Sequence, residues 1–490
     1  MLAFCRISAL LIMLIFPMTE LSRAAAASLP PLAAPPAGER WFSIAMDDEK
    51  KGFSCLTVEA VPDGYVFTGL GSVKMGGVFF SREAWSRERY VVHRDLSLIS
   101  FDVEQEIGGK AMQVSGSSTG VGVRVVVTTP AGREEKLLKA KGAVYPPPVL
   151  NLYPLMRGVS PGKRYRLQML DVEDVRIRAV TFTAVGVETL PGGVKTVHLR
   201  NDLFPVANDI WVDPAGNTVK ESVRDDMIVT LAEDGKSAGM YLVEAALAGR
   251  DLVRRFALVT VLPPIARPRD LRGMVVELSG VPADVRLPEG RGQKVERLPD
   301  NGVRITTTTV SPQRKEETAT PPGSGNPPFL ESDERIPWDN PTLIAQKNAI
   351  LGGEKNQSSA VEKLARWVEL QAGERGSDAG SPLGAASLGA ASLRDGSSQS
   401  LARLYTALAR AAGIPTRVVA GLVYREGEGF QYQCWAESLV GEWMPVDPAA
   451  GEVPADSSHI KVVEGDAPDD LLPLARLIGR IRARVKDLMY

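Results

Sequence analysis

Three residues in the last quarter of the chain have the spacing expected of a nucleophile, a base and an acid that orients the base. Ser398 opens the run SQSLARLYTALARA, Gln433 lies in FQYQCWAE, and Asp447 ends WMPVD. A serine hydroxyl needs a neighbouring base before it attacks an acyl group, and a glutamine amide does not accept a proton near pH 7. The three positions therefore have the arrangement of a thiol catalyst, but the cysteine nucleophile and the histidine base that such a catalyst needs are absent.

The elements that must position these residues can be predicted from periodicity. Apolar residues recur at the spacing of one helix face between 401 and 412, which predicts a helix there. They are Leu401, Leu404, Tyr405, Leu408 and Ala412. Ser398 lies at the N-terminal end of this helix, and Gly413 is a natural stop. Strands are predicted at 416–424 and 430–438. A helix N-terminus stabilises a thiolate, and a neighbouring strand can present a histidine to it, so this layout suits cysteine chemistry.

The relative placement of the two strand residues depends on the hairpin turn. If Leu439–Gly441 forms a three-residue turn, Ser438 pairs with Glu442 and Gln433 lies opposite Asp447. A longer or shorter turn shifts this pairing by one residue. We therefore expect Gln433 and Asp447 to be neighbours across the hairpin.

Residues 338–469 resemble the transglutaminase-like domain of bacterial exported proteins, which has a papain-like α+β fold. The resemblance rests on GSSQSLARLYTALARAAGIPTRVVAGLVY, YQCWAESLVGEWMPVDP and ADSSHIKVVEGD. Active members typically read Gly-Asp-Cys in the first block, Tyr-His-Ala-Trp in the second, and then Trp-x-Pro-Val-Asp-Pro. Here the three places read Gly396–Ser397–Ser398, Tyr432–Gln433–Cys434–Trp435 and Trp443–Met444–Pro445–Val446–Asp447–Pro448.

The resemblance implies that Ser398, Gln433 and Asp447 occupy the catalytic Cys, His and Asp positions, of which only Asp447 is kept. Two changes to uncharged polar residues preserve packing while removing the chemistry, so we expect a pseudoenzyme. Asp447 would then lack an imidazole to orient and would close the hairpin, bonded to Gln433 or to Trp435. The alternative is an active acyltransferase or peptidase that uses Ser398 or Cys434 as its nucleophile.

Other polar residues near the motif have two interpretations each. Cys434 is adjacent to the histidine position, but strand alternation turns it to the opposite face from Gln433, which favours a small buried thiol. His459 is expected to cap a loop; reaching the cleft is the alternative. Glu437 shares a face with Gln433 and is expected to be a solvated strand residue, with a place in the cleft as its alternative.

The aromatic residues of the motif suggest a binding role. Tyr432, Trp435 and Trp443 would flank the cleft of the resembled fold, where they form either a peptide-binding groove or hydrophobic core. The expected function is binding a protein or peptide of the cell envelope, or acting as a scaffold. No cofactor and no metal are expected.

Composition excludes several function classes. The chain has 490 residues with 57 basic and 59 acidic ones, so its net charge of −2 gives no field that attracts nucleic acid or anionic membranes. Only three histidines are present, and no Cys/His cluster has the spacing of zinc ligands. Cys55 and Cys434 could form one bridge, but two separate buried cysteines are expected.

The N-terminus predicts export. Residues 1–27 combine Arg6, the apolar run ISALLIMLIF and the small residues Ala24–Ala27, which is typical of a cleaved signal peptide. A retained anchor is the alternative. We expect a periplasmic or secreted protein that is not an integral membrane protein after signal removal. Residues 28–40 form a proline-rich leader.

The rest of the chain divides by composition. Residues 41–262 are expected to form an antiparallel sandwich or barrel, because runs such as Val121, Val123, Val125 and Val127 or Val175, Ile177 and Ala179 alternate. Turns are predicted at 130–132, 191–193 and 213–217. Residues 263–310 form a small β module or extend the first domain, and 311–337 form a linker.

Helices are expected after the linker and at the end of the chain. One runs from Asn340–Pro341 to Gly352–Gly353, and Ser359 with Glu362 reads as a capping box that opens a second one. The closing segment, residues 470–490, is expected to be a strand or helix packed on the β domain. An amphipathic helix on a membrane or partner is its alternative.

Overall fold

The computed structural model describes residues 28–77, 80–203, 206, 208–249, 253, 256–299, 302–310, 329–373, 397–465 and 467–490. The signal peptide predicted at 1–27 and most of the linker predicted at 311–337 lie outside these residues. The chain divides into two compact units, Met1–Ala238 and Gly239–Tyr490. The division falls inside helix α2, not at the boundary of 262 and 263 suggested by composition.

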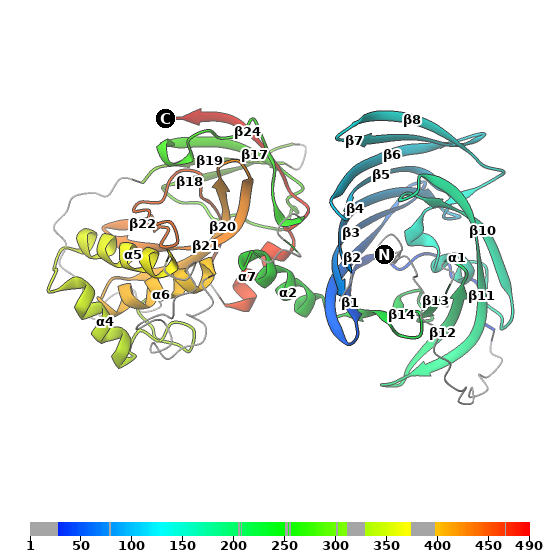
Figure 1. The fold of residues 1–490 in the computed structure, drawn as a ribbon, viewed down its shortest axis with the longest axis horizontal. Coiled ribbons are helices and arrows are strands. Elements are labelled where there is room, and N and C mark those ends of the chain that lie inside the picture. Colours follow the sequence, from blue (N-terminus) through cyan, green and yellow to red (C-terminus); the bar gives the residue numbers. More distant parts are fainter. Residues whose placement is uncertain are drawn as a thin grey trace. The chain divides into compact units, whose positions relative to one another are not determined.

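The first unit is built on one sheet of 15 strands in the order β8-β7-β6-β5-β4-β3-β2-β1-β15-β14-β13-β12-β11-β10-β9. The strands are β1 Gly38–Met46, β2 Glu49–Val61, β3 Gly64–Gly77, β4 Phe80–His93, β5 Leu98–Ile107, β6 Lys110–Thr119, β7 Gly122–Thr129, β8 Gly132–Lys139, β9 Val144–Tyr145, β10 Arg164–Asp171, β11 Arg176–Leu190, β12 Val194–Asn201, β13 Asn208–Val212, β14 Thr218–Val223 and β15 Ile228–Glu233. Neighbours are antiparallel except β9 and β10, which are parallel. The sheet curls around a short segment that holds η2 (Pro147–Val149) and α1 (Leu152–Leu155) (Figure 1).

All 15 strands are hydrogen-bonded in one unbroken order, so this is a single curled sheet and not two stacked ones, and both of its halves share one hydrophobic core. The core joins Val123 and Val125 of β7 with Val180 and Phe182 of β11. The alternation predicted at 121–127 is confirmed for Val123, Val125 and Val127, whereas Val121 precedes β7 and is 60% exposed. The alternation predicted at 175–179 selected the wrong face of β11, because Val175 lies in a turn with φ of 47° and the buried residues are those at 180, 182 and 184.

Turn residues marked the hairpins of this unit correctly. The predicted turns at 130–132, 191–193 and 213–217 join β7 to β8, β11 to β12 and β13 to β14. Gly192 and Gly193 have φ of 87° and 80°, a backbone conformation that glycine adopts without a steric penalty. The Gly and Pro residues of the sequence therefore predicted the positions of these hairpin turns.

The second unit contains two sheets and five helices among its described residues. Its five-stranded sheet has the order β16-β24-β17-β19-β18 and its four-stranded sheet the order β22-β21-β20-β23. The strands are β16 Val261–Leu262, β17 Gly273–Ser279, β18 Gln293–Arg297, β19 Val303–Thr308, β20 Thr416–Arg425, β21 Gly429–Val440, β22 Glu442–Val446, β23 Ile460–Glu464 and β24 Arg482–Met489. The helices are α2 Gly235–Leu247, η3 Pro268–Asp270, α4 Pro341–Leu351, α5 Gln357–Gly373, α6 Ser398–Ala411 and α7 Pro468–Ala475, where η3 is a single 3-10 turn.

The segment at 263–310 and the end of the chain belong to the same sheet. β17 pairs antiparallel with both β19 and β24. The closing segment is thus a helix followed by a strand, and the expectation that it packs on the first β domain is wrong. Its strand packs with the small β module and not with the 15-stranded sheet.

Two helix starts show how side-chain caps set the boundaries. Asn340 accepts a hydrogen bond from the N–H of Thr342 at 2.9 Å, which confirms the predicted start of α4. The capping box predicted at Ser359 is wrong. Asn356 accepts from the N–H of Ser359 at 3.0 Å, so α5 already begins at Gln357.

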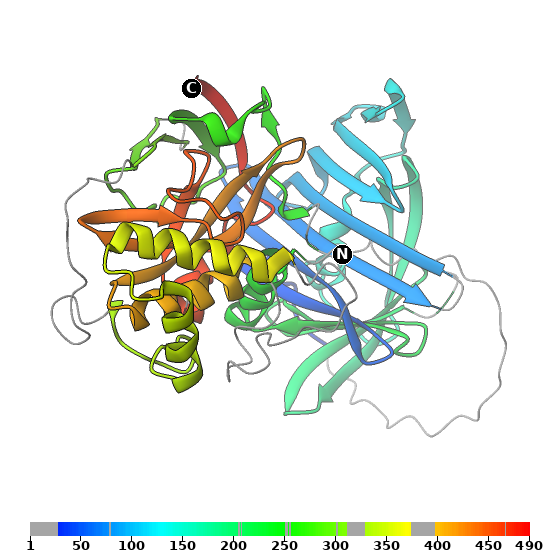
Figure 2. The same ribbon diagram turned by 60° about the vertical axis from the view of Figure 1, so that its left-hand side comes forward.

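The four-stranded sheet lies between α4–α6 and the five-stranded sheet, as both ribbon views show (Figures 1 and 2). On the helix side, the Tyr405 hydroxyl of α6 lies 2.8 Å from the Ser438 hydroxyl of β21. Because side chains alternate along a strand, Cys434 and Ser438 face α6, whereas Gln433, Trp435 and Glu437 face the other way. No helix among the described residues is long and apolar enough to cross a membrane.

Candidate functional site

Ser398 occupies the first turn of α6, next to β21. Ser397 caps the helix, its hydroxyl accepting from the N–H of Ser400 at 3.1 Å. The Ser398 hydroxyl accepts from the N–H of Cys434 at 3.1 Å and donates to the carbonyl of Leu247 at 3.4 Å. Among the described residues these are its hydrogen-bond partners, and both are backbone groups. The hydroxyl is held in place by groups that cannot remove its proton.

Gln433 is engaged by an arginine that sequence reasoning missed. Arg425, the last residue of β20, donates from Nη2 to Oε1 of Gln433 at 2.5 Å. The same nitrogen lies 3.8 Å from Oδ2 of Asp447. A guanidinium group therefore lies between Gln433 and Asp447. Its only sequence signal was a basic residue ending a strand.

The hairpin register differs from the predicted one by two residues. Val440 pairs with Glu442 around Gly441, a shorter turn than expected. The last pair of the ladder is Ala436 with Val446, and continuing it would place Asp447 across from Trp435 instead of Gln433. The predicted pairing of Gln433 with Asp447 is therefore wrong, and Arg425 bridges the two side chains instead.

Asp447 does have an imidazole partner, contrary to expectation. Nε2 of His459 lies 3.2 Å from Oδ2 of Asp447, and both side chains are buried. Nδ1 of His459 faces Asp456, 3.1 Å from its carbonyl oxygen and 3.2 Å from its carboxylate. His459 thus caps its own loop, as expected, and also reaches the retained aspartate. The sequence could not show this, because the contact depends on the path of the loop.

The carboxylates of Asp447 and Asp456 keep the imidazole ring of His459 protonated. Burial by itself lowers the pKa of His459, but hydrogen bonds and charges from Asp447 and Asp456 outweigh it and raise the pKa to about 10. Burial favours a higher pKa for Asp447, yet the bond to His459 holds that pKa below its ordinary value. The group is an imidazolium between two carboxylates. A ring that already holds its proton at pH 7 cannot act as a general base.

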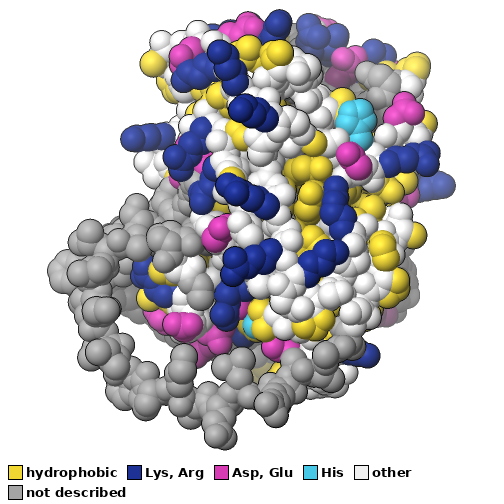
Figure 3. All heavy atoms as spheres, turned by 90° about the vertical axis from the view of Figure 1, so that its right-hand side faces the viewer, with side chains coloured by type: hydrophobic (Ala, Val, Ile, Leu, Met, Phe, Trp, Pro, Cys, Tyr) yellow, Lys and Arg dark blue, Asp and Glu magenta, His cyan; other side chains and the backbone are white. Residues whose placement is uncertain are grey.

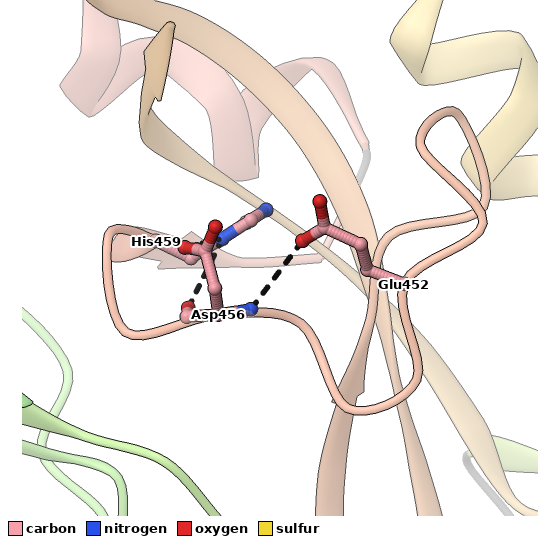
Figure 4. Close-up of side chains that lie close together, drawn as sticks. All are labelled: Glu452, Asp456 and His459. Carbon is pink, nitrogen blue, oxygen red and sulfur yellow. Dashed lines mark hydrogen bonds and ion pairs between the residues drawn. The ribbon is translucent and has the colours of Figure 1, made fainter. Parts of the chain in front are cut away.

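Glu452, Asp456 and His459 form the one group of metal-ligand types found among the described residues, with ligand atoms within 4.8 Å of one another. Figure 4 shows the three side chains converging from one loop. The pKa of Glu452 is raised by burial first and by the charge of Asp456 second, and its Oε1 lies 3.1 Å from Nε of Arg269. Metal ligation needs a neutral imidazole nitrogen, whereas both nitrogens of His459 face oxygen acceptors. The cluster is therefore explained as an ion network.

A groove of about 490 Å³ lies on the face of the four-stranded sheet opposite α6. Trp435, Trp443 and Leu439 line one wall, and Gln293 and Thr307 of the five-stranded sheet line the other. Tyr432 is buried and does not line the groove. The aromatics expected to flank one cleft are thus divided between the two faces of the sheet.

Glu437 is a buried groove residue, so its interpretation as a solvated strand residue is wrong. Its carboxylate lies 2.7 Å from Nη2 of Arg417 and 2.9 Å from Nζ of Lys461. The Arg417 guanidinium also lies over the Trp443 ring, 4.3 Å from its centroid. The charges at the base of the groove are therefore balanced, and Trp443 is fixed in orientation.

The two cysteines within the described residues are separate and buried. Cys434 is 1% exposed and Cys55 is 3% exposed, and neither forms a disulfide. This agrees with the expected pair of buried thiols. A thiol without solvent access is poorly placed to meet a substrate.

Comparisons with known structures find weak likenesses. One match is a β-barrel-like protein from Brucella abortus with a domain of unknown function, DUF1849. It is 10% identical, the match covers 41% of this chain and 96% of the Brucella chain, and the TM-score is 0.31. A candidate cysteine protease from Cytophaga hutchinsonii is 18% identical over 44% of this chain and 86% of its own, with a TM-score of 0.26. A DUF1089 family protein from Pseudomonas aeruginosa is 13% identical over 41% and 95%, with a TM-score of 0.23.

None of these likenesses carries an argument at such TM-scores. The search among curated proteins finds no match. Residues 344–448, which hold Ser398, Gln433 and Asp447, match the family model of the transglutaminase-like superfamily. The second unit of this chain therefore contains a transglutaminase-like superfamily domain.

Proposed function

We propose that this protein is exported, that its transglutaminase-like domain is not catalytic, and that the domain binds a peptide segment of a cell-envelope partner. The observation that carries the proposal is the position of His459, the only histidine among residues 239–490. Its ring lies between the carboxylates of Asp447 and Asp456 and is protonated at neutral pH. The domain thus keeps an aspartate–histidine pair as a structural element instead of a catalytic one.

The surroundings of Ser398 support the same conclusion. Thiol catalysts in this position rely on a low pKa of the thiol, whereas a hydroxyl depends on a base. The hydrogen-bond partners of Ser398 are two backbone groups, and the side chain of Gln433, which faces away from α6, is held by Arg425. The alternative nucleophile, Cys434, is buried on the α6 side of the sheet.

The groove supplies the features of a peptide site. Its volume of about 490 Å³ falls in the range of small-ligand pockets. It offers the ring of Trp443 and the side chain of Leu439 as apolar contacts, with Thr308 and Gly290 on the facing wall. Because Arg417, Glu437 and Lys461 are paired with one another, an incoming peptide needs no compensating charge.

Catalysis is tested with a fluorophosphonate probe and intact-mass measurement. The proposal expects no covalent adduct on the folded protein over hours at pH 7 to 8. The Ser398→Ala variant provides the matched background. A Ser398 adduct that forms rapidly in the folded protein and not after unfolding would overturn the non-catalytic assignment.

Peptide binding is tested by panning a displayed peptide library on the folded protein and measuring the Kd of enriched peptides by fluorescence anisotropy. Leu439→Ala, inside the groove, should weaken binding at least fivefold. Leu370→Ala on α5, where Leu370 is 51% exposed, is the matched control and should leave the Kd unchanged. If no enriched peptide binds, or if both variants bind equally well, the groove is not the peptide site.

A further inference from the structure

The interior of the 15-stranded sheet contains a small cavity with carboxylates in its wall. The cavity measures about 50 Å³ and is lined by residues of β1–β4 and β14 together with the segment at 147–151. Glu88 of β4 and Glu221 of β14 both line it, at 7% and 2% exposure. Two buried carboxylates on one cavity are costly unless a positive charge or hydrogen-bond donors compensate them.

Three polar atoms of this cavity wall have no hydrogen-bond partner within the described residues. They are Oγ of Ser54, Oδ1 of Asn151 and Oε1 of Glu221. Ser54 is 3% exposed and Glu221 is 2% exposed. Buried polar atoms in native proteins nearly always have a partner, so these atoms indicate that water or a polar ligand occupies the cavity. Oδ1 of Asn151 can only accept, Oγ of Ser54 can donate or accept, and Oε1 of Glu221 accepts when its carboxyl group is ionised, so a group with several donors would satisfy all three.

The charges around the cavity indicate whether the group that binds there is positively or negatively charged. Among the described residues that line it, none is Lys, Arg or His. An adjoining smaller cavity shares Glu88 and Pro147 and adds Asp171, whose carboxylate lies 3.6 Å from Nε of Arg176. By contrast, Lys and Arg side chains are spread over the outer face of this unit (Figure 3). Positive charge is thus present outside the sheet and missing from the cavity wall.

We propose that this cavity binds the ammonium group of a small organic cation, of the primary alkylammonium class. An ammonium group has three N–H donors, which matches the three unpartnered acceptors of Ser54, Asn151 and Glu221. Its single positive charge compensates the carboxylate of Glu221, whereas the carboxylate of Glu88 also accepts a hydrogen bond from Ser86 at 2.9 Å. Phe42, Leu70 and other apolar lining residues provide contacts for a short alkyl chain.

The size of the cavity limits the ligand. A volume of about 50 Å³ holds roughly three or four groups of the size of water. This suits ethylammonium or the terminal amine of a longer molecule. Burial raises the pKa of Glu221, and a bound cation would favour the ionised carboxylate again.

Gly69 gives a way to fill the cavity without changing its charge. A Cβ atom at this position would lie 3.6 Å from Cβ and 3.8 Å from Oε2 of Glu88, which is ordinary contact. Gly69 lies in the middle of β3, where a β-branched residue is favourable. Gly69→Val should therefore fold and should occupy space beside the carboxylate.

The test is calorimetric titration of the full chain with ethylammonium chloride, compared with ethanol and sodium acetate at matched ionic strength. We expect saturable 1:1 binding of ethylammonium and none of the other two. Glu221→Gln and Gly69→Val should each weaken binding at least tenfold. Glu135→Gln, which changes a 58% exposed carboxylate on β8, is the matched control and should bind as the wild type does.

Thermal melting of each variant shows that it is folded, and Glu221→Gln should be at least as stable as the wild type because it removes a buried charge. Absence of saturable ethylammonium binding would overturn the proposal. So would equal binding of ethanol, which would assign the cavity to neutral hydroxyl groups, or unchanged binding in folded Glu221→Gln. This inference is independent of the function proposed for the second unit.

Discussion

Nε2 of His459 lies 3.2 Å from Oδ2 of Asp447, although Asp447 ends β22 and His459 directly precedes β23. In the resembled family the aspartate orients an imidazole on the neighbouring strand, at the position of Gln433. In this chain the imidazole that contacts Asp447 lies directly before β23 and not on β21. The pair holds the loop between β22 and β23 closed, and the N–H of Ala449 donates to the other oxygen of Asp447 at 2.9 Å.

The pKa of His459 makes the stability of the second unit dependent on pH. Its pKa is about 10 when folded and near 6.5 in an unfolded chain, so the folded state binds the proton more tightly. This contribution is fully present below pH 6.5 and is lost as pH rises toward 10. The free energy of unfolding of the wild type should therefore fall over that range by up to about 5 kcal/mol more than that of His459→Gln.

Urea unfolding at pH 6.0 to 9.5, followed with a probe in the second unit, measures this difference. His93→Gln is the matched control, because His93 is an exposed residue of the first unit. It should leave the pH dependence unchanged. If the curves of the wild type and His459→Gln run parallel, the carboxylates do not hold a proton on the ring.

Restoring the catalytic residue types should require a third change. In a Ser398→Cys, Gln433→His double variant, the Arg425 guanidinium that now bonds Gln433 at 2.5 Å would lie against the new imidazole. Like charges disfavour the imidazolium and hence the thiolate–imidazolium pair. Adding Arg425→Leu should raise the rate of thiol alkylation by iodoacetamide at pH 6.5 at least tenfold.

The control adds Arg366→Leu, on the exposed surface of α5, to the same double variant. This change should leave the alkylation rate unaltered. Equal rates in the double and triple variants would show that Arg425 does not block the site. An acyl-enzyme formed by the triple variant alone would support the proposal that the natural chain is not catalytic.

Cys434 should be inert in the folded protein. It is 1% exposed, and Cys55 is 3% exposed, so neither thiol is accessible to a reagent in water. In a Cys5→Ser background, Ellman's reagent should titrate fewer than 0.2 thiols per chain within minutes under native conditions and two thiols in guanidinium. Rapid native titration that disappears in Cys434→Ser would restore Cys434 as a candidate nucleophile.

Local sequence patterns predicted the elements of the site but not the contacts between them. Helix α6 follows from the spacing of Leu401, Leu404 and Leu408, and its start at Ser398 follows from the cap. The pairing of the two strands of the hairpin depends on one turn residue. Gly441 makes the turn shorter than expected, and this alone moves Asp447 away from Gln433.

Contacts that depend on loop paths could not be predicted from spacing. His459 reaches Asp447 only because the loop between β22 and β23 folds back, and Arg425 reaches Gln433 diagonally across β20 and β21. The prediction selected the wrong face of β11 for a related reason. Both faces of that strand carry apolar residues, so alternation alone does not show which face is buried. The number of strands and the curling of their sheet are set by tertiary packing around one core.

Glu437 should be the residue of the groove whose charge matters most for stability. It compensates Arg417 and Lys461, all three being largely buried, and removing one partner leaves the others without full compensation. Glu464 also contacts both cations, at 2.6 and 2.8 Å, which limits the loss. Glu437→Gln should therefore destabilise the second unit by about 1–3 kcal/mol at pH 7.

The control is Glu426→Gln, which changes an exposed carboxylate in the turn between β20 and β21 and should change stability by less than about 0.5 kcal/mol. An equally small effect of Glu437→Gln in urea unfolding would mean that Glu464 alone neutralises both cations, and that the groove is less firmly held than its contacts suggest.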